Sequence, residues 1–388
     1  MTSTYHIGDT RAVLRTLPAG SVDLIVSSPP FLALRSYLPA DHPDKHAEIG
    51  SESTPGEFLD VLLDVVDECR RVLAPHGSLC FELGDTYAGS SADGGGSLGS
   101  EKYPSGRSGM VKVNDRRRGT GWPLAKSLCL IPQSFAFALS YGRNPHTGRT
   151  IEPWRVRNIV RWWRPNPPVG ALGDKWRPAT SEITVACTSA RRYWDDIATR
   201  TEHKADPATY TGNGYSKGNP EGVPGNESMP GNLAGAPLQD TWKIPTHGFK
   251  GAHYATYPPA LVEPLVKAMC PRRVCTVCGE PSRRIVDVQY RDASGAAVDA
   301  ARWAGPGETG RGEHHNQPWA TSHPAHVGWT DCGHDSWRRG VVLDPFGGTG
   351  TTGQVAEGLG HDSILIDLDA RNADLARDRV GMFLKVAT

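Results

Sequence analysis

The segment that most constrains the fold lies near the C-terminus and combines a strand, a glycine-rich loop, a helix and an acidic residue. Val341 to Asp344 is apolar and predicts a buried strand, and the glycine-rich residues 345–352 (PFGGTGTT) follow it. A helix is expected up to Leu359, and the next strand, Ser363 to Asp367, ends in a carboxylate. Strand, loop, helix and strand in this order predict part of a parallel sheet covered by helices.

The spacing within this segment indicates a class of ligand. Glycine lets the backbone turn sharply and approach a ligand closely. Asp367 follows Gly350 by 17 residues, close to the separation of roughly 20 at which a carboxylate meets a ribose diol. The loop lacks the Gly-Lys-Ser/Thr ending of an ATP loop and a full G-x-G-x-x-G. Both absences favour a nucleoside without phosphates, such as S-adenosylmethionine; a tight turn with no ligand is the alternative.

A second candidate site follows an apolar strand near the N-terminus. Ser21 to Ser27 is followed by Ser28, Pro29, Pro30 and Phe31. The two prolines fix the backbone and remove two N–H donors, and ligands of open α/β sheets bind outside the carboxyl ends of the strands. A hydroxyl and a rigid carbonyl could accept both hydrogens of an exocyclic base amine, and Phe31 could stack on a base rotated out of a duplex. A proline-stiffened turn is the alternative.

Other segments predict regular elements that would complete the sheet. A capping-box pattern at Thr54 to Glu57 begins a helix that is expected to end at Pro75 to Gly77. The further expected elements are a strand at Thr4–Ile7, a helix at Arg11–Leu17, and strands at Ser78–Leu83, Arg155–Trp163 and Glu182–Thr188.

Charge and composition restrict the partners. The 388 residues include 42 Lys and Arg and 42 Asp and Glu, so the net charge of zero disfavours a generic polyanion binder. Nucleic-acid contact must come from local clusters such as Arg116-Arg117-Arg118 and the Arg- and Trp-rich residues 154–164, for which a solvated surface is the alternative. The sequence shows no signal-peptide pattern and no run near the roughly 20 apolar residues of a membrane span. A cytoplasmic protein without membrane contact is expected.

Two pairs of metal-binding residue types predict a zinc site. Cys275-x-x-Cys278 lies in a turn, and Cys332-Gly-His334 follows after a gap of 53 residues. Paired Cys and His residues at these spacings are typical of tetrahedral zinc, and four protein ligands would make the ion structural. Free surface thiols or a redox pair are the alternatives. Other candidates for the fourth ligand are Cys270, His314, His315, His323 and His326.

Together these segments resemble a known family. Ser28 to Phe31 is similar to the catalytic motif of amino-methylating DNA methyltransferases, and Asp344 to Thr352 is similar to their cofactor motif. His253 to Glu263 resembles the segment that precedes the cofactor motif, and Gly8-Asp9 resembles the element that reaches the cofactor adenine. The catalytic motif comes first and the cofactor motif last, which resembles the β class of these enzymes.

The resemblance implies a fold and a set of site residues. The fold would be the Rossmann-like α/β sheet of S-adenosylmethionine-dependent methyltransferases, with a circularly permuted motif order and irregular insertions. Catalytic roles are implied for Ser28, Pro29, Pro30 and Phe31. Cofactor binding is implied for Asp9, His253, Thr256, Pro258, Asp344, Pro345, Phe346, Gly347, Gly348, Thr349, Gly350, Thr351, Thr352 and Asp367.

The expected organisation interleaves two halves of one domain with insertions. The catalytic half is residues 1–85, a flexible insertion is 86–121, and the domain continues through 122–194. A target-recognition region at 195–246, a lead-in at 247–269, a zinc-binding insertion at 270–340 and the cofactor half at 341–388 follow.

The expected activity is methyl transfer from S-adenosylmethionine to the exocyclic amine of a flipped base in double-stranded DNA. In the family, Ser at the first catalytic position goes with cytosine N4 and Asp with adenine N6, so Ser28 favours cytosine N4 and adenine N6 is the alternative. Alternatives of other classes are an inactive zinc-containing DNA-binding protein and a methyltransferase for RNA or a small molecule. Cognate restriction or defence proteins are possible partners.

Overall fold

The computed structural model describes residues 1–33, 38–39, 41–89, 119–167, 174–201, 235–246, 256–291, 297–298, 321–381 and 384–387. The chain divides into two compact units. The first comprises Met1–Trp194, Gln239–Pro281 and His334–Thr388, and the second comprises Asp195–Leu238 and Ser282–Gly333. Residues 90–118 with Arg116 to Arg118, most of the expected target-recognition region, and His253, His314 and His315 lie outside the described residues.

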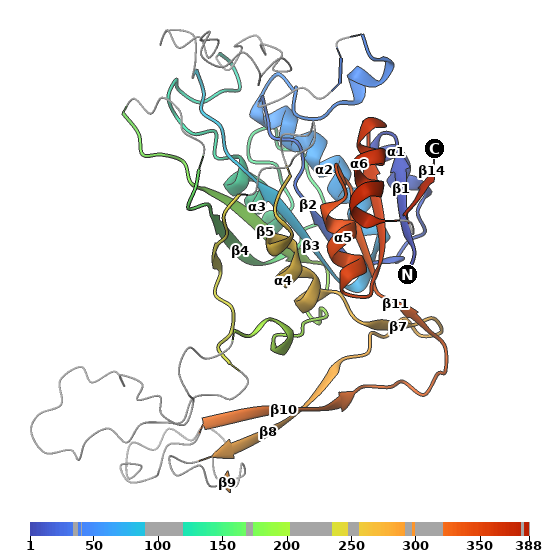
Figure 1. The fold of residues 1–388 in the computed structure, drawn as a ribbon. Helices are drawn as coiled ribbons and strands as arrows, with labels where there is room; N and C mark the ends of the chain where they lie inside the picture. The colour runs from blue at the N-terminus through green and yellow to red at the C-terminus, as the bar shows by residue number, and fades with distance from the viewer. Residues whose placement is uncertain are drawn as a thin grey trace, which may run out of the picture. The chain divides into compact units, whose positions relative to one another are not determined.

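A nine-stranded sheet of described residues lies at the centre of the first unit (Figure 1). Its first five strands, in spatial order, are β14 (Leu384–Ala387), β1 (Ser3–Ile7), β13 (Asp362–Asp367), β12 (Val341–Asp344) and β2 (Val22–Ser27). The order continues with β3 (Leu73–Leu83), β5 (Thr180–Cys187), β4 (Arg155–Trp163) and β6 (Thr241–Lys243). The strands from β14 to β3 run parallel, and β5 is antiparallel to both β3 and β4.

The pairing of β2 with β12 joins segments from opposite ends of the sequence. Leu24 lies opposite Val342 and Ile25 opposite Leu343 in parallel register. The carboxyl ends of the two strands therefore lie side by side, and each is followed by a segment singled out in the sequence. This confirms the expected α/β fold, in which the N-terminal and C-terminal segments form one sheet.

Helices cover both faces of the sheet because successive strand residues point to opposite sides. Ile25, Leu79 and Phe81 pack into one buried cluster with α1 (Thr10–Thr16), α2 (Pro55–Val72) and α3 (Ile131–Tyr141). Leu24 and Cys80 pack on the other face with α4 (Pro259–Met269) and α5 (Thr351–Gly358). The last helix, α6 (Arg371–Val380), packs on β1 and β13 through Ala376 and Val380. The two apolar layers hold the sheet edge in place for the residues beyond it.

The start of α2 matches its sequence signature, but its end does not. The Thr54 hydroxyl accepts a hydrogen bond from the N–H of Glu57 at 3.1 Å, which is the expected cap. The helix ends at Val72, and β3 begins at once with Leu73. The prediction that Pro75 to Gly77 ends the helix is therefore wrong. These residues bulge out of β3, because Leu73 pairs with Val22 and Ser78 already pairs with Leu24.

Two helices, α3 and α4, and several strands, among them β6 and β14, were not predicted. Helix α3 is preceded by Leu130 in the left-handed conformation, and the carboxylate of Asp85 accepts the N–H groups of Leu130 and Ile131. This cap comes from a residue 45 positions earlier and cannot be read from the local sequence. Helix α4 carries Pro264 inside it, and β14 follows α6 and pairs with β1.

The end of the sheet opposite the carboxyl edge holds a compensated buried acid. Asp23 of β2 is fully buried and accepts hydrogen bonds from His76 at 2.9 Å and from Arg338 at 2.5 Å. The N–H of Val341 donates to the same carboxylate at 2.8 Å. Arg338 lies on β11 (Trp337–Arg339), which pairs with β7 (Arg273–Cys275). Asp23 thus joins β2, β3 and the strand that leads into β12.

The second unit is smaller and contains its own sheet. Its strands lie in the order β10 (Thr321–Trp329), β8 (Arg284–Arg291) and β9 (Ala297–Val298). Arg284 forms an ion pair with Asp195 at 2.9 Å and lies over the ring of Trp329. In the part of the chain that the structure describes, every helix is too short or too polar to cross a bilayer.

Candidate active site

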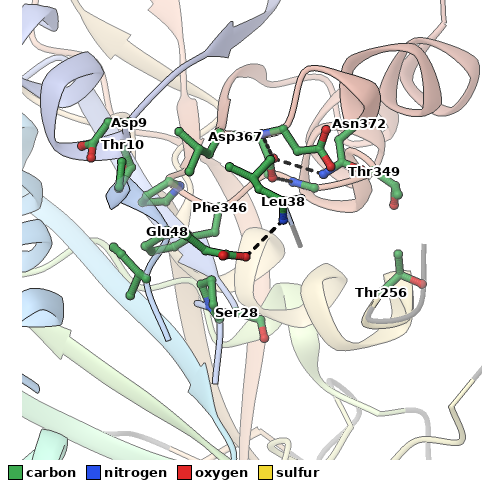
Figure 2. Close-up of a pocket in the computed structure, with 18 of the residues that line it drawn as sticks. Asp9, Thr10, Ser28, Leu38, Glu48, Thr256, Phe346, Thr349, Asp367 and Asn372 are labelled. Carbon is green, nitrogen blue, oxygen red and sulfur yellow. Dashed lines mark hydrogen bonds between the residues drawn. The ribbon is translucent and has the colours of Figure 1, made fainter. Parts of the chain in front are cut away.

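A cavity lies at the carboxyl edge of the sheet, where β1, β2, β12 and β13 end (Figure 2). Many of the residues predicted for catalysis or cofactor binding line it: Asp9, Ser28, Pro30, Thr256, Pro345, Phe346, Gly347, Gly348, Thr349, Thr351 and Asp367. Other predicted residues lie outside the lining: Pro29, Phe31, Pro258, Asp344, Gly350 and Thr352. The structure thus brings the N-terminal tetrapeptide and the glycine-rich loop to one cavity.

Asp367 ends β13 and presents a half-buried carboxylate to the cavity. One carboxylate oxygen accepts the N–H of Gly348 at 2.8 Å, and the other accepts the side-chain amide of Asn372 at 3.1 Å. Burial raises the pKa of Asp367 to about 6. A carboxylate held by neutral donors keeps lone pairs for further hydrogen bonds, which is the requirement for binding a ribose diol.

The glycine-rich loop is shaped by close backbone approaches. The N–H of Gly347 donates to the carbonyl of Ile366 at 2.7 Å, and a Cβ at position 347 would lie 2.9 Å from the Cβ of Leu365. Gly350 has a φ of +80° and is the N-cap of α5. Only glycine suits these two positions, so the loop can follow β13 closely before it turns into the helix.

Asp344 holds the loop to the catalytic strand from behind the cavity. Its carboxylate accepts hydrogen bonds from the hydroxyls of Ser27 at 2.5 Å, Thr352 at 2.5 Å and Tyr257 at 2.8 Å, and from the N–H of Phe346 at 3.0 Å. Burial raises the pKa of Asp344, although these donors oppose the effect. Because Ser27 directly precedes Ser28, this network fixes the position of the tetrapeptide relative to the loop.

Ser28 donates its hydroxyl proton to Glu82 at 2.6 Å. Glu82 lies near the end of β3 and is nearly buried, and burial raises its pKa against the opposing effect of the Ser181 and Ser28 hydroxyls and the charge of Arg164. A hydroxyl that donates to a carboxylate keeps its oxygen lone pairs free to accept. The Ser28 oxygen can therefore accept a hydrogen bond from a ligand, and the Glu82 carboxylate can take up a proton.

Phe31 and Asp9 each have a structural contact in addition to the role predicted for them. The ring of Phe31 packs against the core and over Gly84, where a Cβ would lie 2.6 Å from its Cε2. Asp9 caps α1 by accepting the N–H of Arg11 at 2.7 Å, and it also forms an ion pair with that side chain. Asp9 lines the cavity while serving as this cap.

The Arg- and Trp-rich residues 154–164 are divided between core and surface. Trp154 and Trp162 are buried, whereas Trp163 is 40% exposed and lies under the ammonium group of Lys243. Arg161 forms an ion pair with Glu182, and Arg164 is bound to the carbonyl of Thr180. Most of the cluster thus supports β4 and its neighbours, and Trp163 remains at the surface.

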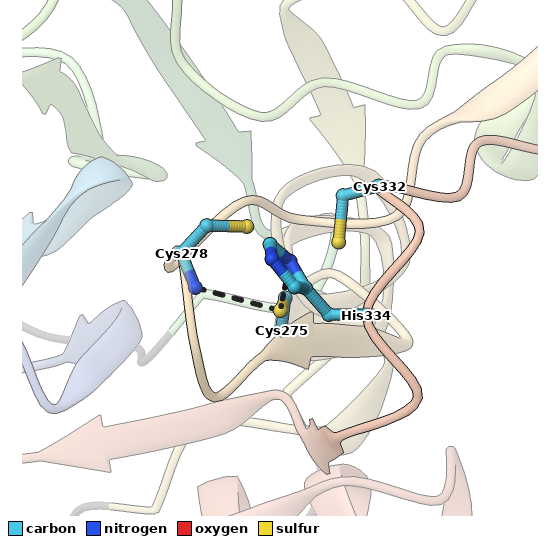
Figure 3. Close-up of side chains that lie close together, drawn as sticks. All are labelled: Cys275, Cys278, Cys332 and His334. Atoms are coloured by element: carbon cyan, nitrogen blue, oxygen red, sulfur yellow. Dashed lines mark hydrogen bonds between the residues drawn. The ribbon is translucent and has the colours of Figure 1, made fainter.

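The four predicted zinc ligands lie together (Figure 3). The sulfur atoms of Cys275, Cys278 and Cys332 and a ring nitrogen of His334 all lie within 4.8 Å of one another. Atoms bound to one tetrahedral zinc through bonds of about 2.3 Å would lie roughly 3.8 Å apart. The N–H groups of Val277 and Cys278 donate to the sulfur of Cys275, as expected for a thiolate. The donor set and its spacing fit a tetrahedral ion.

Sequence reasoning missed three side chains that shape the cavity. Glu82 contacts Ser28 across 54 positions, Tyr257 contacts Asp344 across 87, and Asn372 contacts Asp367 from the following helix. An acid inside the apolar strand CFEL was the available signal for Glu82, because a buried carboxylate requires a partner. Tyr257 lies within the segment His253 to Glu263 singled out by the resemblance, although no role was assigned to it, and Asn372 carried no comparable signal.

Comparison with known proteins agrees with this geometry. The model of the N6/N4 DNA methylase family matches residues 22–275 and 333–378 of this chain. The Type II methyltransferase M.XycI of Xanthomonas campestris pv. cyanopsidis is 31% identical over 268 residues, which is 69% of this chain and 72% of that protein. The Type II methyltransferase M.SmaI of Serratia marcescens is 23% identical over 375 residues, which is 96% of this chain and 89% of that protein.

Among solved structures, the PvuII DNA methyltransferase (cytosine-N4-specific) is similar in fold. The TM-score is 0.51 at 12% sequence identity, over 97% of this chain and 86% of that chain. The family match extends over more than half of the chain and includes both the tetrapeptide after β2 and the loop after β12. The chain therefore belongs to the N6/N4 DNA methylase family, as the resemblance of its motifs predicted.

Proposed function

We propose that this DNA methylase transfers a methyl group from S-adenosylmethionine to N4 of cytosine in double-stranded DNA. The observation that carries the proposal is the contact between Ser28 and Glu82 in the cavity that Asp367 and the glycine-rich loop also line. This contact supports the proposal because a hydroxyl oxygen able to accept from a base amine lies in the same cavity as the groups that a nucleoside cofactor requires.

The residues of the cavity fit S-adenosylmethionine. Asp367 would accept the ribose hydroxyls, and the close approach of Gly347 to β13 leaves room for the ligand beside the loop. Phe346 lines the cavity and offers an apolar surface. When bound, the cofactor supplies an electrophilic methyl group on a sulfonium sulfur.

The chain's own residues would activate the base. An exocyclic amine is a poor nucleophile because its lone pair is delocalised into the ring. The oxygen of Ser28 would accept one amine hydrogen while its own proton stays directed at Glu82. The carbonyl of Ser28 or Pro29 would accept the other hydrogen, so that the nitrogen becomes tetrahedral and can attack the methyl group. The amine would lose one proton as the new N–C bond forms, and Glu82, whose pKa is raised by burial, would take that proton through Ser28.

Cytosine N4 is favoured over adenine N6 for two reasons. The first catalytic position is Ser28, which in this family goes with cytosine N4, and the PvuII structure that shares the fold is described as cytosine-N4-specific. The test is to incubate the protein with tritiated S-adenosylmethionine and duplex DNA, and then to digest the DNA to nucleosides. Label in N4-methylcytosine is expected. Label in N6-methyladenine would support the alternative base, and label in 5-methylcytosine or in no nucleoside would overturn the proposal.

We also propose that Cys275, Cys278, Cys332 and His334 bind one structural zinc ion. The support is the grouping of four suitable ligand atoms within 4.8 Å. Metal analysis of the purified protein is expected to find about one zinc per chain, and Cys278→Ser and Cys332→Ser should each lower that content strongly. His326→Ala is the matched control, because His326 is exposed and lies outside the cluster. Equal zinc content in all variants would contradict the assignment.

A further inference from the structure

Arg379 lies in the last turn of α6 and reaches back to the glycine-rich loop. Its Nη1 donates to the hydroxyl oxygen of Thr349 at 2.7 Å and to that of Thr351 at 2.6 Å. Both threonines are nearly buried and line the cavity, whereas Arg379 does not. The guanidinium group therefore lies one hydroxyl group away from the cavity.

The direction of these hydrogen bonds fixes what the threonines can offer. A guanidinium group has five N–H donors, no acceptor, and a permanent positive charge. Each threonine oxygen must therefore accept from Arg379, which leaves its single hydroxyl proton for another partner. Within the described part of the chain, neither Thr349 nor Thr351 donates that proton to another group. The two hydroxyls are thus available as donors, polarised by the cation behind them.

The charges around the cavity indicate that the hydroxyls of Thr349 and Thr351 suit a ligand carboxylate. Among the described residues, the side chains that line the cavity include four acids, Asp9, Glu48, Asp367 and Asp369, and no Lys or Arg. Three of these acids have cationic partners outside the lining, whereas Asp367 accepts from the neutral donors Gly348 and Asn372. A ligand carboxylate would be repelled by Asp367 unless donors and positive charge were supplied locally. Arg379 supplies the charge, and α5, which begins at Thr351, adds the positive end of its dipole.

We propose that Arg379 is a positioning residue that makes the hydroxyls of Thr349 and Thr351 donors for the α-carboxylate of the cofactor. The inference rests on the proposed function, because it takes S-adenosylmethionine as the cofactor. It adds that the methionine end is recognised by charge at the start of α5, separately from the ribose at Asp367. Arg379 acts through the two threonines and does not touch the ligand itself.

Two ligands that differ in the amino-acid part provide the test. S-adenosylhomocysteine carries the α-carboxylate, whereas 5′-methylthioadenosine keeps the adenine, ribose and sulfur without it. Calorimetry on the full chain is expected to show that Arg379→Met weakens binding of S-adenosylhomocysteine roughly 10- to 100-fold, the range for hydrogen bonds to a charged group. Binding of 5′-methylthioadenosine should change less than about twofold, because that ligand makes no use of the donors.

Two further variants separate this role from a structural one. Arg377→Met removes an exposed arginine of the same helix, paired with Asp374, and should leave both affinities unchanged. Thr349→Val with Thr351→Val keeps the guanidinium group but removes the proton donors, and should reproduce the selective loss even if Arg379→Met fails to fold.

Each pattern of results has one meaning. Selective loss of S-adenosylhomocysteine binding in Arg379→Met supports the proposal, as does the same loss in the double threonine variant where Arg379→Met does not fold. Equal weakening of both ligands means that Arg379 only braces the loop, and unchanged binding of both means that it does not act on the ligand; either result overturns the proposal. Wild-type protein that binds neither ligand would instead refute the proposed cofactor, and with it this inference.

Discussion

Buried carboxylates lie at both ends of β2 and its neighbouring strands, but their surroundings differ. Asp23, at the end away from the cavity, is bound by His76 and Arg338. Burial alone would raise the pKa of Asp23, but these partners outweigh it and hold the pKa below its ordinary value. At the carboxyl edge, Glu82, Asp344 and Asp367 contact mainly hydroxyls and amides, and burial raises the pKa of each.

The difference separates residues that support the fold from residues placed to meet a ligand. A buried charge without a full counter-charge costs stability and persists where surrounding structure or function requires it. Asp23 has its counter-charges within the chain, so its contribution belongs to the fold. Of the three acids at the carboxyl edge, Asp367 lines the cavity and Glu82 contacts Ser28, which lines it. Under the proposed function, ligand hydroxyls would complete the contacts of Asp367, whereas Asp344 holds the loop to β2 from behind the cavity. Variants at the two ends should therefore fail in different ways.

The largest effect is expected from Ser28→Ala. Without the hydroxyl, nothing at this position accepts the amine hydrogen or connects it to Glu82, so turnover should fall about 10³-fold. Cofactor affinity should stay within about twofold, because the contacts of Asp367 and the loop do not involve Ser28. Single-turnover methylation and calorimetry with S-adenosylhomocysteine measure the two quantities.

Glu82→Gln tests the contact between Ser28 and Glu82 by changing the acceptor. The amide still accepts the Ser28 proton but cannot take up a proton, so a fall of about 10²-fold in turnover is expected with little change in cofactor affinity. If Ser28→Ala or Glu82→Gln lost cofactor binding and turnover in equal measure, the contact would be structural. Glu82 would then support the fold, as Asp23 does.

The second effect is a loss of stability at the Asp23 end. Asp23→Asn leaves the charge of Arg338 and the ring of His76 without their carboxylate partner, and breaking a buried pair in this way costs about 3–5 kcal/mol in unfolding free energy. Cofactor affinity of the folded fraction should be unchanged. Urea unfolding measures the loss. Asp374→Asn, at an exposed ion pair, is the control and should change stability by less than about 0.5 kcal/mol. An Asp23→Asn protein as stable as wild type would contradict the claim that Asp23 stabilises the fold.

Much of the fold and part of the site could be predicted from the sequence, because the signals were local. The apolar strand from Val341 to Asp344, the cap at Thr54 and the glycine-rich loop depend on neighbouring residues. That the two ends of the chain share one sheet was expected from the order of motifs in a related family, and the pairing of Leu24 with Val342 confirms it.

What sequence reasoning missed depends on contacts between distant residues. Glu82, Tyr257 and Arg379 contact their partners across at least 28 positions. The cap of α3 by Asp85 crosses 45 positions, and the bulge at Pro75 to Gly77 exists because β3 must pair with β2 while His76 reaches Asp23. Each of these features is set by the packing of the sheet, and no local pattern in the sequence records it.

The smallest expected effect is a dependence of cofactor binding on pH. Asp367 has a pKa of about 6 in the free protein, so above this pH it is a carboxylate that can accept the ribose hydroxyls, and below it the added proton removes an acceptor. Affinity for S-adenosylhomocysteine should fall as the pH drops through 6 and be about tenfold weaker at pH 5. The stability that Asp23 contributes is fully present above its unfolded pKa of about 3.9 and is lost only as the pH falls through its lower folded pKa.

Between pH 7 and pH 5 the two ends of the sheet should therefore respond differently, with cofactor affinity falling while the contribution of Asp23 to stability stays constant. The ligand pair used for Arg379 sharpens this prediction, because 5′-methylthioadenosine keeps the ribose and should show the same pH dependence as S-adenosylhomocysteine. Asp367→Asn should bind both ligands more weakly and without the change near pH 6. A pH dependence that persists in Asp367→Asn, or that is confined to the ligand with the carboxylate, would mean that a different group titrates and that Asp367 does not bind the ribose.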